Sequence, residues 1–375
     1  MELTQAQRQA RDAFMAFVRE RIVPHAEEWD QAERLPRELA GDLAAQGWLG
    51  AAISAEHGGT PLDAVTFGLL NEAIGYGCSS ARSLLTVHSM VSAAVNRWGS
   101  RELKAGWLPR LASGEVVGAF ALTEPHAGSD ASMISSTATR KGQVYVLNGV
   151  KRWITYGRAA DVFLVFARCE EGPTAFLVER DSPGLEVTPI HGVLGTRASM
   201  TAQLDFRDCA VPAANVVGRP GFGLSAVCSG ALETGRYTVA WGCVGILQAC
   251  LDDSLAYAAG REQFGRRIAD HQLVRRMLAD LATESVAARL LCLRAGLLRQ
   301  EGDPESVAAT WMAKYYASRA AFRAASDTVQ IHGANGCAAE SRAQRMLRDA
   351  KIMEIIEGST EIQQSMIAEA AYRSR

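Results

Sequence analysis

The sequence lacks the patterns that identify several large classes of protein. No run of about 18 apolar residues is present, so a membrane-spanning helix is not expected. The charged, amphipathic start MELTQAQRQARDAF has no apolar core of the kind that a signal peptide needs. No GxGxxG follows a candidate strand and no GxxxxGK[ST] occurs. Neither Rossmann nor P-loop nucleotide binding is therefore indicated.

Neither the net charge nor the cysteine spacing indicates a nucleic-acid, membrane or zinc-binding protein. The 39 basic and 41 acidic residues give a formal net charge of −2, without a polybasic or acidic run. Electrostatic capture of nucleic acid or of an anionic membrane is not indicated. The eight cysteines are scattered singly, with no CxxC pair and no zinc-ligand spacing. We expect reduced thiols in a cytoplasmic protein and no metal site.

Three segments differ in their periodicity, which predicts a multidomain protein of α and β parts. Residues 1–118 have helical spacing, with helices expected over 4–22, from Pro36 to Trp48, and over 63–76, 83–98 and 101–113, and with Pro24 ending the first. Residues 119–225 contain short runs rich in Val, Phe, Leu and Thr, with turns expected at Asn148–Gly149 and Ser182–Gly184. That pattern predicts an antiparallel sheet or small barrel. Residues 226–375 return to long helices that can form a four-helix bundle.

Two short motifs carry candidate binding groups. LTEPHAGSD (122–130) combines the hydroxyls of Thr123 and Ser129 with main-chain donors freed by Gly128. Such a loop can direct N–H and O–H groups at a heterocycle or a phosphate, although a capped surface loop has the same composition. KRWIT (151–155) places Trp153 and Thr155 on one face of a predicted strand, an arrangement that suits either an isoalloxazine ring or plain core packing.

Glu357 is the candidate catalytic base. RDAKIMEIIEGSTEIQ (348–363) predicts a helix interrupted at Gly358, with Glu357 just before the break, after Ile355 and Ile356. A carboxylate among apolar neighbours, with no obvious lysine nearby, has its charged form disfavoured by desolvation, as a general base working near neutral pH requires. A glutamate at a helix end can equally be a solvated or capping residue.

Five motifs together carry a resemblance. LTEPHAGSD, KRWIT, REQFGRRIADHQ (261–272), QIHGANG (330–336) and RDAKIMEIIEGSTEIQ occur in the order and spacing of the acyl-CoA dehydrogenase family, and the resemblance covers essentially the whole chain. It implies an acyl-CoA dehydrogenase fold with a helical N-terminal domain, a central β-barrel domain and a C-terminal four-helix bundle, and with FAD between the last two domains.

The resemblance also assigns residues. Thr123 and Ser129 would bond the flavin ring edge, Trp153 and Thr155 would flank its reactive face, and the 261–264 and 330–333 stretches would hold the diphosphate and adenine of a neighbouring subunit. The implied cofactor contacts are Leu122, Thr123, Gly128, Ser129, Trp153, Thr155, Arg261, Gln263, Phe264, Gln330, Gly333 and Ser359. A shared site implies a homodimer or a dimer of dimers. Ser359 replaces the usual Thr and keeps its hydroxyl, whereas Ala334 replaces a common glycine and puts that flavin contact in doubt.

The implied chemistry is oxidation of an acyl thioester. The main-chain N–H of Glu357 and a flavin hydroxyl polarise the thioester carbonyl, Glu357 removes the α-proton, and hydride leaves the β-carbon for the flavin. An electron-transfer partner or oxygen then reoxidises the flavin. The residues implied at the substrate are Arg82, Ser83, Arg236 and Gly358.

Two stretches resemble a subset of the family. CSSARSLLTVHSM (78–90) and GRYTVAWGCVGILQAC (235–250) are similar to the acyl-carrier-protein dehydrogenases of hydroxymalonyl and methoxymalonyl extender-unit biosynthesis for polyketides. The implied substrate is a three-carbon, glycerol-derived acyl group on a carrier protein, oxidised at an oxygenated C3, which need not follow the desaturation scheme. Arg82 suits a distal carboxylate or an aldehyde hydrate, or it is an arginine on a solvated helix face.

Other interpretations stay open. The basic pairs Arg275–Arg276 and Arg97–Arg101 suit docking of an acidic carrier or a solvated helix face, and His88 suits packing. The main alternative is a short-chain or glutaryl-type acyl-CoA dehydrogenase that desaturates free CoA thioesters. Further alternatives are a flavin oxidase or monooxygenase on the same scaffold, and a catalytically inactive binding protein.

Overall fold

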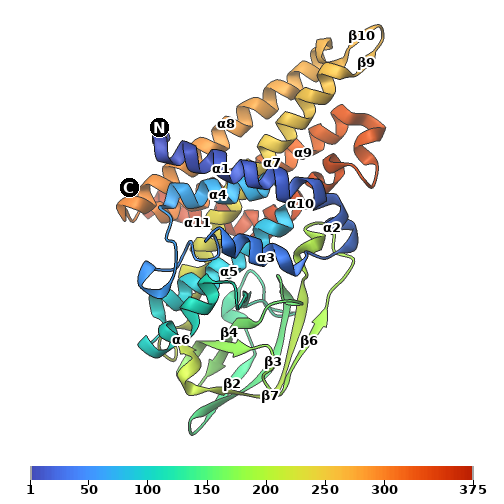
Figure 1. Ribbon diagram of the computed structural model, residues 1–375. Coiled ribbons are helices and arrows are strands. Elements are labelled where there is room, and N and C mark those ends of the chain that lie inside the picture. Colours follow the sequence, from blue (N-terminus) through green and yellow to red (C-terminus); the bar gives the residue numbers. More distant parts are fainter. Residues whose placement is uncertain (1, 374–375) are drawn as a thin grey trace.

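The computed structural model describes residues 2–373 and begins with a helical layer (Figure 1). Its helices are α1 (Gln5–Arg21), α2 (Ala26–Ala32), α3 (Arg37–Ala45), α4 (Ala64–Gly77), α5 (Ser79–Trp98) and α6 (Arg101–Ala112). Local chemistry fixes several of the starts. Thr4 and Gln7 form a capping box at α1, and Asp63 accepts from the main chain of Thr66 at the start of α4.

Two boundaries in this layer differ from the sequence prediction. Pro24 ends α1 as expected, but it lies in a 3₁₀ turn, Val23–His25, and the chain resumes as α2, which the prediction missed. Proline is tolerated at the first positions of a helix because the missing N–H has no partner there. Helix α3 ends at Ala45 rather than reaching Trp48, because Gly47 adopts a left-handed conformation with φ of 75°.

An eight-stranded sheet follows the helical layer. Its strands are β1 (Gly118–Ala121), β2 (Thr137–Lys141), β3 (Val144–Ile154), β4 (Val162–Cys169), β5 (Gly172–Glu179), β6 (Leu185–Pro189), β7 (Ala202–Pro212) and β8 (Val216–Val217). They are ordered β6-β7-β3-β2-β4-β5-β8, with β1 also paired to β4. The expected antiparallel pairing holds for most of the sheet, but β1 and β2 both pair with β4 in parallel. Neither is joined to β4 by a hairpin, so a tight turn does not impose antiparallel pairing.

One predicted turn is confirmed and the other is wrong. Ser182–Gly184 lies between β5 and β6, with Gly184 at φ of 86°. Asn148–Gly149 instead lies inside β3, where the pairing with β7 shifts register. This is a β-bulge, and Gly149 fits it because its φ is 142° and a Cβ atom there would overlap Ser136.

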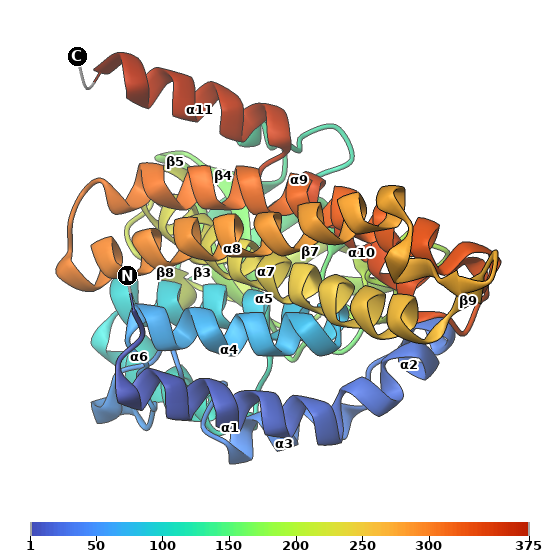
Figure 2. The ribbon, with the colours of Figure 1, turned by 90° about the horizontal axis from the view of Figure 1, so that it is seen from above.

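The C-terminal part is helical. Its elements are a π-helical turn (Gly223–Cys228), α7 (Ser229–Gly260), the hairpin β9 (Glu262–Gln263) and β10 (Arg266–Arg267), α8 (Gln272–Glu301), α9 (Ser306–His332), α10 (Arg342–Ile355) and α11 (Thr360–Arg373). Figure 2 shows α11 outside the packed helices, beside α9. The break between α10 and α11 lies at the predicted position, around Gly358.

Helix α7 forms the centre of the helical part. Among the described residues, only the continuous helical stretch Gly223–Gly260 is long and apolar enough to cross a membrane, and 67% of its most apolar window is buried. Trp241 and Tyr237 on α7 are fully buried core residues. The apolar character of this helix is therefore that of a core helix of the bundle.

Candidate active site

A cavity of about 590 Å³ lies where the sheet, α5, α7 and the α10–α11 junction meet. It brings together predicted residues that are far apart in the sequence. Those that line it are Arg82, Ser83, Leu122, Thr123, Gly128, Ser129, Trp153, Thr155, Arg236, Glu357, Gly358 and Ser359. The volume and the mixed apolar and polar lining are those of a site for a small organic ligand.

Glu357 lies in a turn with an unusual backbone. Helix α10 ends at Ile355, Glu357 has φ of 54°, and Gly358 has φ of 90° before α11 begins. A left-handed conformation at a glutamate is disfavoured unless its surroundings hold it. Here the carbonyl oxygen of Glu357 accepts from Arg236 Nε at 3.3 Å and from Gln363 Nε2 at 3.2 Å. The turn directs the carboxylate into the cavity.

The side chain of Glu357 is partly buried in the lining of the cavity. Its Oε2 atom is buried and has no hydrogen-bond partner among the described residues. Burial raises the pKa of Glu357 to about 7, although the positive charges of Arg236, Arg82 and Lys314 oppose the rise. The sequence expectation of a desolvated carboxylate is met, but the expectation of no nearby lysine is wrong. Lys314 comes from α9, 43 positions earlier in the chain, which local sequence reading does not reveal.

Arg82 is buried beside the same cavity, not on a solvated helix face. Its side chain is 1% exposed, and it donates to Thr86 Oγ1 at 2.8 Å and to Ser83 Oγ at 2.9 Å. No carboxylate of the described residues lies within ion-pair distance of its guanidinium, and Nε has no hydrogen-bond partner. A cation in this position is expensive to bury without a counter-ion.

The 122–130 loop rests on a buried ion pair. Lys151 Nζ lies 2.7 Å from Glu124 Oε1 and also donates to the Leu122 carbonyl at 3.0 Å. Glu124 accepts further hydrogen bonds from the main chain of Ser135 and Ser136. Burial alone would raise the pKa of Glu124, but Lys151 and the serines outweigh it and lower the pKa to about 2. The loop is therefore anchored from beneath, while Thr123, Gly128 and Ser129 face the cavity.

Trp153 and Thr155 share the cavity, but not through simple strand alternation. Strand β3 ends at Ile154, its register shifts after Lys151, and Trp153 has φ of 63°. The indole is 51% exposed, so the interpretation of Trp153 as core packing is wrong. The guanidinium of Arg152 lies 4.9 Å from the ring centroid, within the range of a cation–π interaction.

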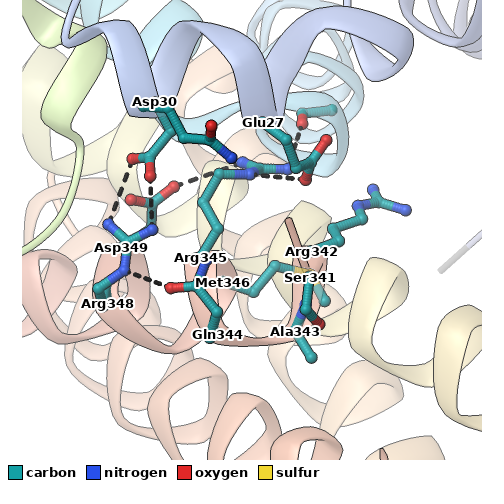
Figure 3. Close-up of polar contacts among 12 residues, drawn as sticks. Glu27, Asp30, Ser341, Arg342, Ala343, Gln344, Arg345, Met346, Arg348 and Asp349 are labelled. Atoms are coloured by element: carbon teal, nitrogen blue, oxygen red, sulfur yellow. Dashed lines mark hydrogen bonds and ion pairs between the residues drawn. The ribbon is translucent and has the colours of Figure 1, made fainter. Parts of the chain in front are cut away.

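Helix α10 is clamped before it reaches Glu357 (Figure 3). Arg348 pairs with Asp30 of α2 at 2.5 Å, and Arg345 pairs with Glu27 of the same helix at 2.9 Å. Asp349 accepts from the main chain of Thr196 at 2.6 Å. These bonds fix α10 against the N-terminal helices and against the loop before β7, which supplies Val193, Leu194, Gly195, Thr196, Ser199 and Thr201 to the cavity lining. The sequence prediction missed this loop, because it carries no motif.

Five predicted cofactor residues lie elsewhere. Arg261, Gln263, Phe264, Gln330 and Gly333 are all exposed and do not line the cavity. The β9–β10 hairpin that carries Gln263 projects from one end of the helical bundle, away from the sheet (Figure 1). Phe264 is 94% exposed with φ of 56°. Within one chain these residues do not join the site.

The remaining candidates also lie outside the cavity. Arg97, Arg101, Arg275 and Arg276 are exposed and none lines it. His88 is buried, and its Nδ1 accepts from the Gly118 main chain at 3.3 Å. Burial lowers the pKa of His88 to about 4, as for a neutral packing histidine.

Comparison with known proteins matches nearly the whole chain. The N-terminal, middle and C-terminal domain models of acyl-CoA dehydrogenases match residues 4–115, 119–209 and 221–372. A probable acyl-CoA dehydrogenase of Bacillus subtilis, YngJ, is 39% identical, with 98% of each chain covered. The short-chain specific acyl-CoA dehydrogenase of Clostridium acetobutylicum is 34% identical, with 99% of each covered. Glutaryl-CoA dehydrogenase of Desulfococcus multivorans is 36% identical, with 98% of this chain and 95% of that protein covered.

Solved structures agree. A glutaryl-CoA dehydrogenase bound to glutaryl-CoA superposes with a TM-score of 0.95 at 34% identity, covering 100% of this chain and 97% of the other. FkbI, described as acting in biosynthesis of the methoxymalonyl extender unit of the polyketide FK520, gives 0.89 at 36% identity, covering 96% and 99%. The prolyl acyl carrier protein oxidase AnaB gives 0.94 at 29% identity, covering 99% and 100%. The chain therefore belongs to the acyl-CoA dehydrogenase family, whose members are FAD-dependent oxidoreductases acting on acyl thioesters.

Proposed function

We propose that this enzyme oxidises a short acyl thioester whose acyl group ends in a carboxylate or in hydroxyl groups, and that Glu357 removes the α-proton. The finer form of the proposal is a three-carbon hydroxylated acyl group on an acyl carrier protein, on the way to hydroxymalonyl or methoxymalonyl thioesters. The single observation that carries the proposal is the buried guanidinium of Arg82, which lines the same cavity as Glu357 and lacks a carboxylate partner among residues 2–373.

The residues present fit a flavin ring. Thr123 and Ser129 offer hydroxyls, Trp153 offers a half-exposed aromatic plane, and all line one cavity with Glu357. We assign the ring edge to Thr123 and Ser129, its face to Trp153 and Thr155, and flanking contacts to Leu122, Gly128 and Ser359. The flavin supplies the two-electron acceptor of the reaction.

Proton removal fits the geometry of the Glu357 turn. Among residues 2–373 the main-chain N–H of Glu357 donates no hydrogen bond, so it is available to a thioester carbonyl. Such a donor stabilises the negative charge that grows on the carbonyl oxygen as the α-proton leaves. The carboxylate, with a pKa of about 7, is an efficient proton acceptor near neutral pH.

The polar acyl end follows from Arg82. A charge-assisted hydrogen bond from a guanidinium to a carboxylate or a geminal diol is stronger than one to a neutral hydroxyl. The hydroxyls of Ser83 and Thr86 accept from the guanidinium, and the Ser83 hydroxyl can also donate to the same acyl group, whereas Thr86 donates to Thr238. Short alkyl chains would leave the cation without a counter-ion, at a cost in binding free energy.

We propose a homodimer whose subunits share their cofactor sites. We propose that Arg261, Gln263, Phe264, Gln330 and Gly333 hold the diphosphate and adenine of a neighbouring subunit. A phenylalanine that is 94% exposed at the tip of a hairpin, and a helix α11 that lies beside α9 outside the packed bundle, are both suited to burial by a second copy (Figure 2).

A second candidate is a short-chain or glutaryl-type acyl-CoA dehydrogenase. It is favoured by the 34% and 36% identity to the short-chain and glutaryl relatives over nearly the full length. The two candidate functions differ in the carrier of the acyl group, in the chemical group at the end of the acyl chain, and in the reaction catalysed. Anaerobic flavin reduction separates them when butyryl, glutaryl and glyceryl groups are each presented on CoA and on an acyl carrier protein. The proposal expects fastest bleaching by the glyceryl carrier; rapid bleaching by butyryl-CoA with no response to glyceryl species would refute it.

A further inference from the structure

Lys314 contacts the turn that holds Glu357. It lies on α9, its side chain is fully buried, and it does not line the cavity. Its Nζ atom donates to the Gly358 carbonyl at 2.7 Å and to the Glu354 carbonyl at 3.4 Å. The ammonium group therefore connects the last turn of α10 to the left-handed turn that holds Glu357.

No acidic side chain explains why this lysine is buried. Among residues 2–373 no carboxylate lies within ion-pair distance of Nζ, whereas the buried cations Lys151, Arg236 and Arg345 each have one and only Arg82 shares the lack of a partner. A buried ammonium group held only by carbonyl oxygens is costly, since main-chain dipoles replace its hydration only in part. A salt bridge to an acidic side chain therefore does not account for the burial of Lys314. Its hydrogen bonds to the turn that holds Glu357 are the alternative explanation.

We propose that Lys314 is a positioning residue for the Glu357 base. Its ammonium group holds the left-handed turn through the Gly358 carbonyl, and its positive charge favours the ionised form of Glu357. The inference rests on Glu357 acting as the base, but not on the identity of the acyl group.

The hydrogen bonds at the turn divide into two sets. Arg236 and Gln363 hold the Glu357 carbonyl, whereas Lys314 makes the shortest contact to the Gly358 carbonyl, which Gln363 reaches at 3.4 Å. Because φ is positive at both Glu357 and Gly358, a small rotation about the 357–358 peptide would redirect the carboxylate. The Lys314 bond opposes that rotation.

Charges from several elements face Glu357. Arg82 of α5, Arg236 of α7 and Lys314 of α9 each favour its ionised form, and the Cys228 thiol lies close by. Lys314 in turn faces Cys243 and Arg236 of α7 and Glu354 of α10, besides Glu357 itself. Burial lowers the pKa of Lys314 to about 8, so the ammonium form still dominates at neutral pH.

The test compares Lys314→Met, Lys314→Gln and Lys314→Arg with Lys351→Met as a control. Lys351 lies on α10, half-exposed, and pairs with the side chain of Glu354. The acid limb of the pH profile of kcat/KM is measured with whichever thioester reduces the wild-type flavin fastest. Infrared difference spectra of the flavin-loaded protein without substrate, referenced to Glu357→Gln, follow the titration of the same carboxyl without turnover.

We expect the acid limb and the infrared titration of Lys314→Met and Lys314→Gln to move up by about one pH unit, a tenfold loss of rate on the acid side. The plateau at higher pH should fall further in the Met variant, because the Gln side chain still donates to Gly358. Lys314→Arg should restore the acid limb, and Lys351→Met should match the wild type.

An unshifted limb in a folded, flavin-loaded Met or Gln variant would overturn the proposal. Failure of both neutral variants to fold would also overturn it, because Lys314 would then be a general folding residue. If no thioester reduces the wild-type flavin, the proposed function fails while the infrared titration still decides the role of Lys314.

Discussion

Gly235 of α7 faces the carboxylate of Glu357 so closely that a Cβ atom at position 235 would overlap its Oε2. The added Cβ atom would also lie 3.0 Å from the Sδ atom of Met90. Residue 235 is therefore a glycine for a steric reason that involves the catalytic group, in the interior of a long helix where glycine is otherwise unfavourable. At position 235 the space that the Glu357 carboxylate needs, rather than helix propensity, determines the residue.

Gly235→Ala should consequently damage catalysis more than stability. The added methyl group displaces the carboxylate, and a misplacement of about 1 Å can cost about 100-fold in rate. Helix propensity gains about 0.5–1 kcal/mol from the same change, which offsets part of the packing strain. Rates of anaerobic flavin reduction and urea unfolding curves measure the two effects separately.

Gly106→Ala is the matched control. Gly106 lies inside α6 with no atom within 4 Å of an added Cβ, so the variant should gain stability and keep the wild-type rate. A Gly235→Ala enzyme as active as Gly106→Ala would show that Glu357 does not need the position seen in the structure.

Arg82→Met tests the polar acyl end. Loss of a charge-assisted hydrogen bond is worth about 2–3 kcal/mol, so kcat/KM should fall about 100-fold for glyceryl or glutaryl thioesters and much less for butyryl-CoA. Folding stability should hold or rise, since Met removes an unpaired buried cation. Arg82→Lys, which keeps the charge without the planar fork, should lie between. An equal loss of kcat/KM for all thioesters would mean that Arg82 does not bind the end of the acyl group.

The sequence predicts the site well where contacts are local and poorly where they are not. Glu357, its desolvation and the break at Gly358 follow from one short stretch of apolar residues and a glycine. Lys314 does not, because α9 meets the turn only after the helices pack, and a lysine in a helical run usually indicates a solvated face. Trp153 shows another limit. The two-residue rule predicts that it shares a strand face with Thr155, and both do line the cavity, but an irregular strand end, with φ of 63° at Trp153, places them there.

The fold shows the same division. Gly149 occupies a bulge rather than a turn because Asn148 bonds across to Asp208, a partner 60 positions away. The parallel pairing of β1 and β2 with β4 depends on the path of the long 122–136 segment, which no dipeptide encodes. By contrast, helix starts that depend on capping residues, such as Thr4 and Asp63, can be predicted from residues that are close together in the sequence.

Lys151→Met should be strongly destabilising. It leaves the Glu124 carboxylate buried and unpaired beneath the 122–130 loop, at a cost of about 3–5 kcal/mol. Because the pKa of Glu124 is lowered from 4.5 to about 2 in the folded chain, its contribution is present above pH 4.5 and is lost as the pH falls towards 2. Urea unfolding at several pH values should therefore show the wild type and Lys151→Met converging in acid.

Arg207→Met serves as the control for that change. Its partner Glu186 is 3.6 Å away and both side chains are exposed, so less than about 1 kcal/mol should be lost. Destabilisation of the two variants by similar amounts would contradict a structural role for the Glu124–Lys151 pair.

Glu357 should make the folded protein less stable as the pH rises. Its pKa is raised from 4.5 to about 7, so its contribution is complete below pH 4.5 and is lost as the pH passes from 4.5 through 7. The shift corresponds to about 3 kcal/mol as an upper bound. Flavin-free Glu357→Gln should escape this loss and be the more stable protein above pH 7. Parallel stability curves for the two proteins would show that the carboxyl titrates normally.

The most direct measurement is anaerobic, substrate-driven flavin reduction by Glu357→Gln, with flavin content checked by absorbance. Glutamine preserves the size of the side chain but cannot accept the α-proton, so the rate should fall at least about 1,000-fold while flavin binding and thioester affinity persist. Flavin bleaching at the wild-type rate, or a wild-type protein that binds no flavin, would contradict the account.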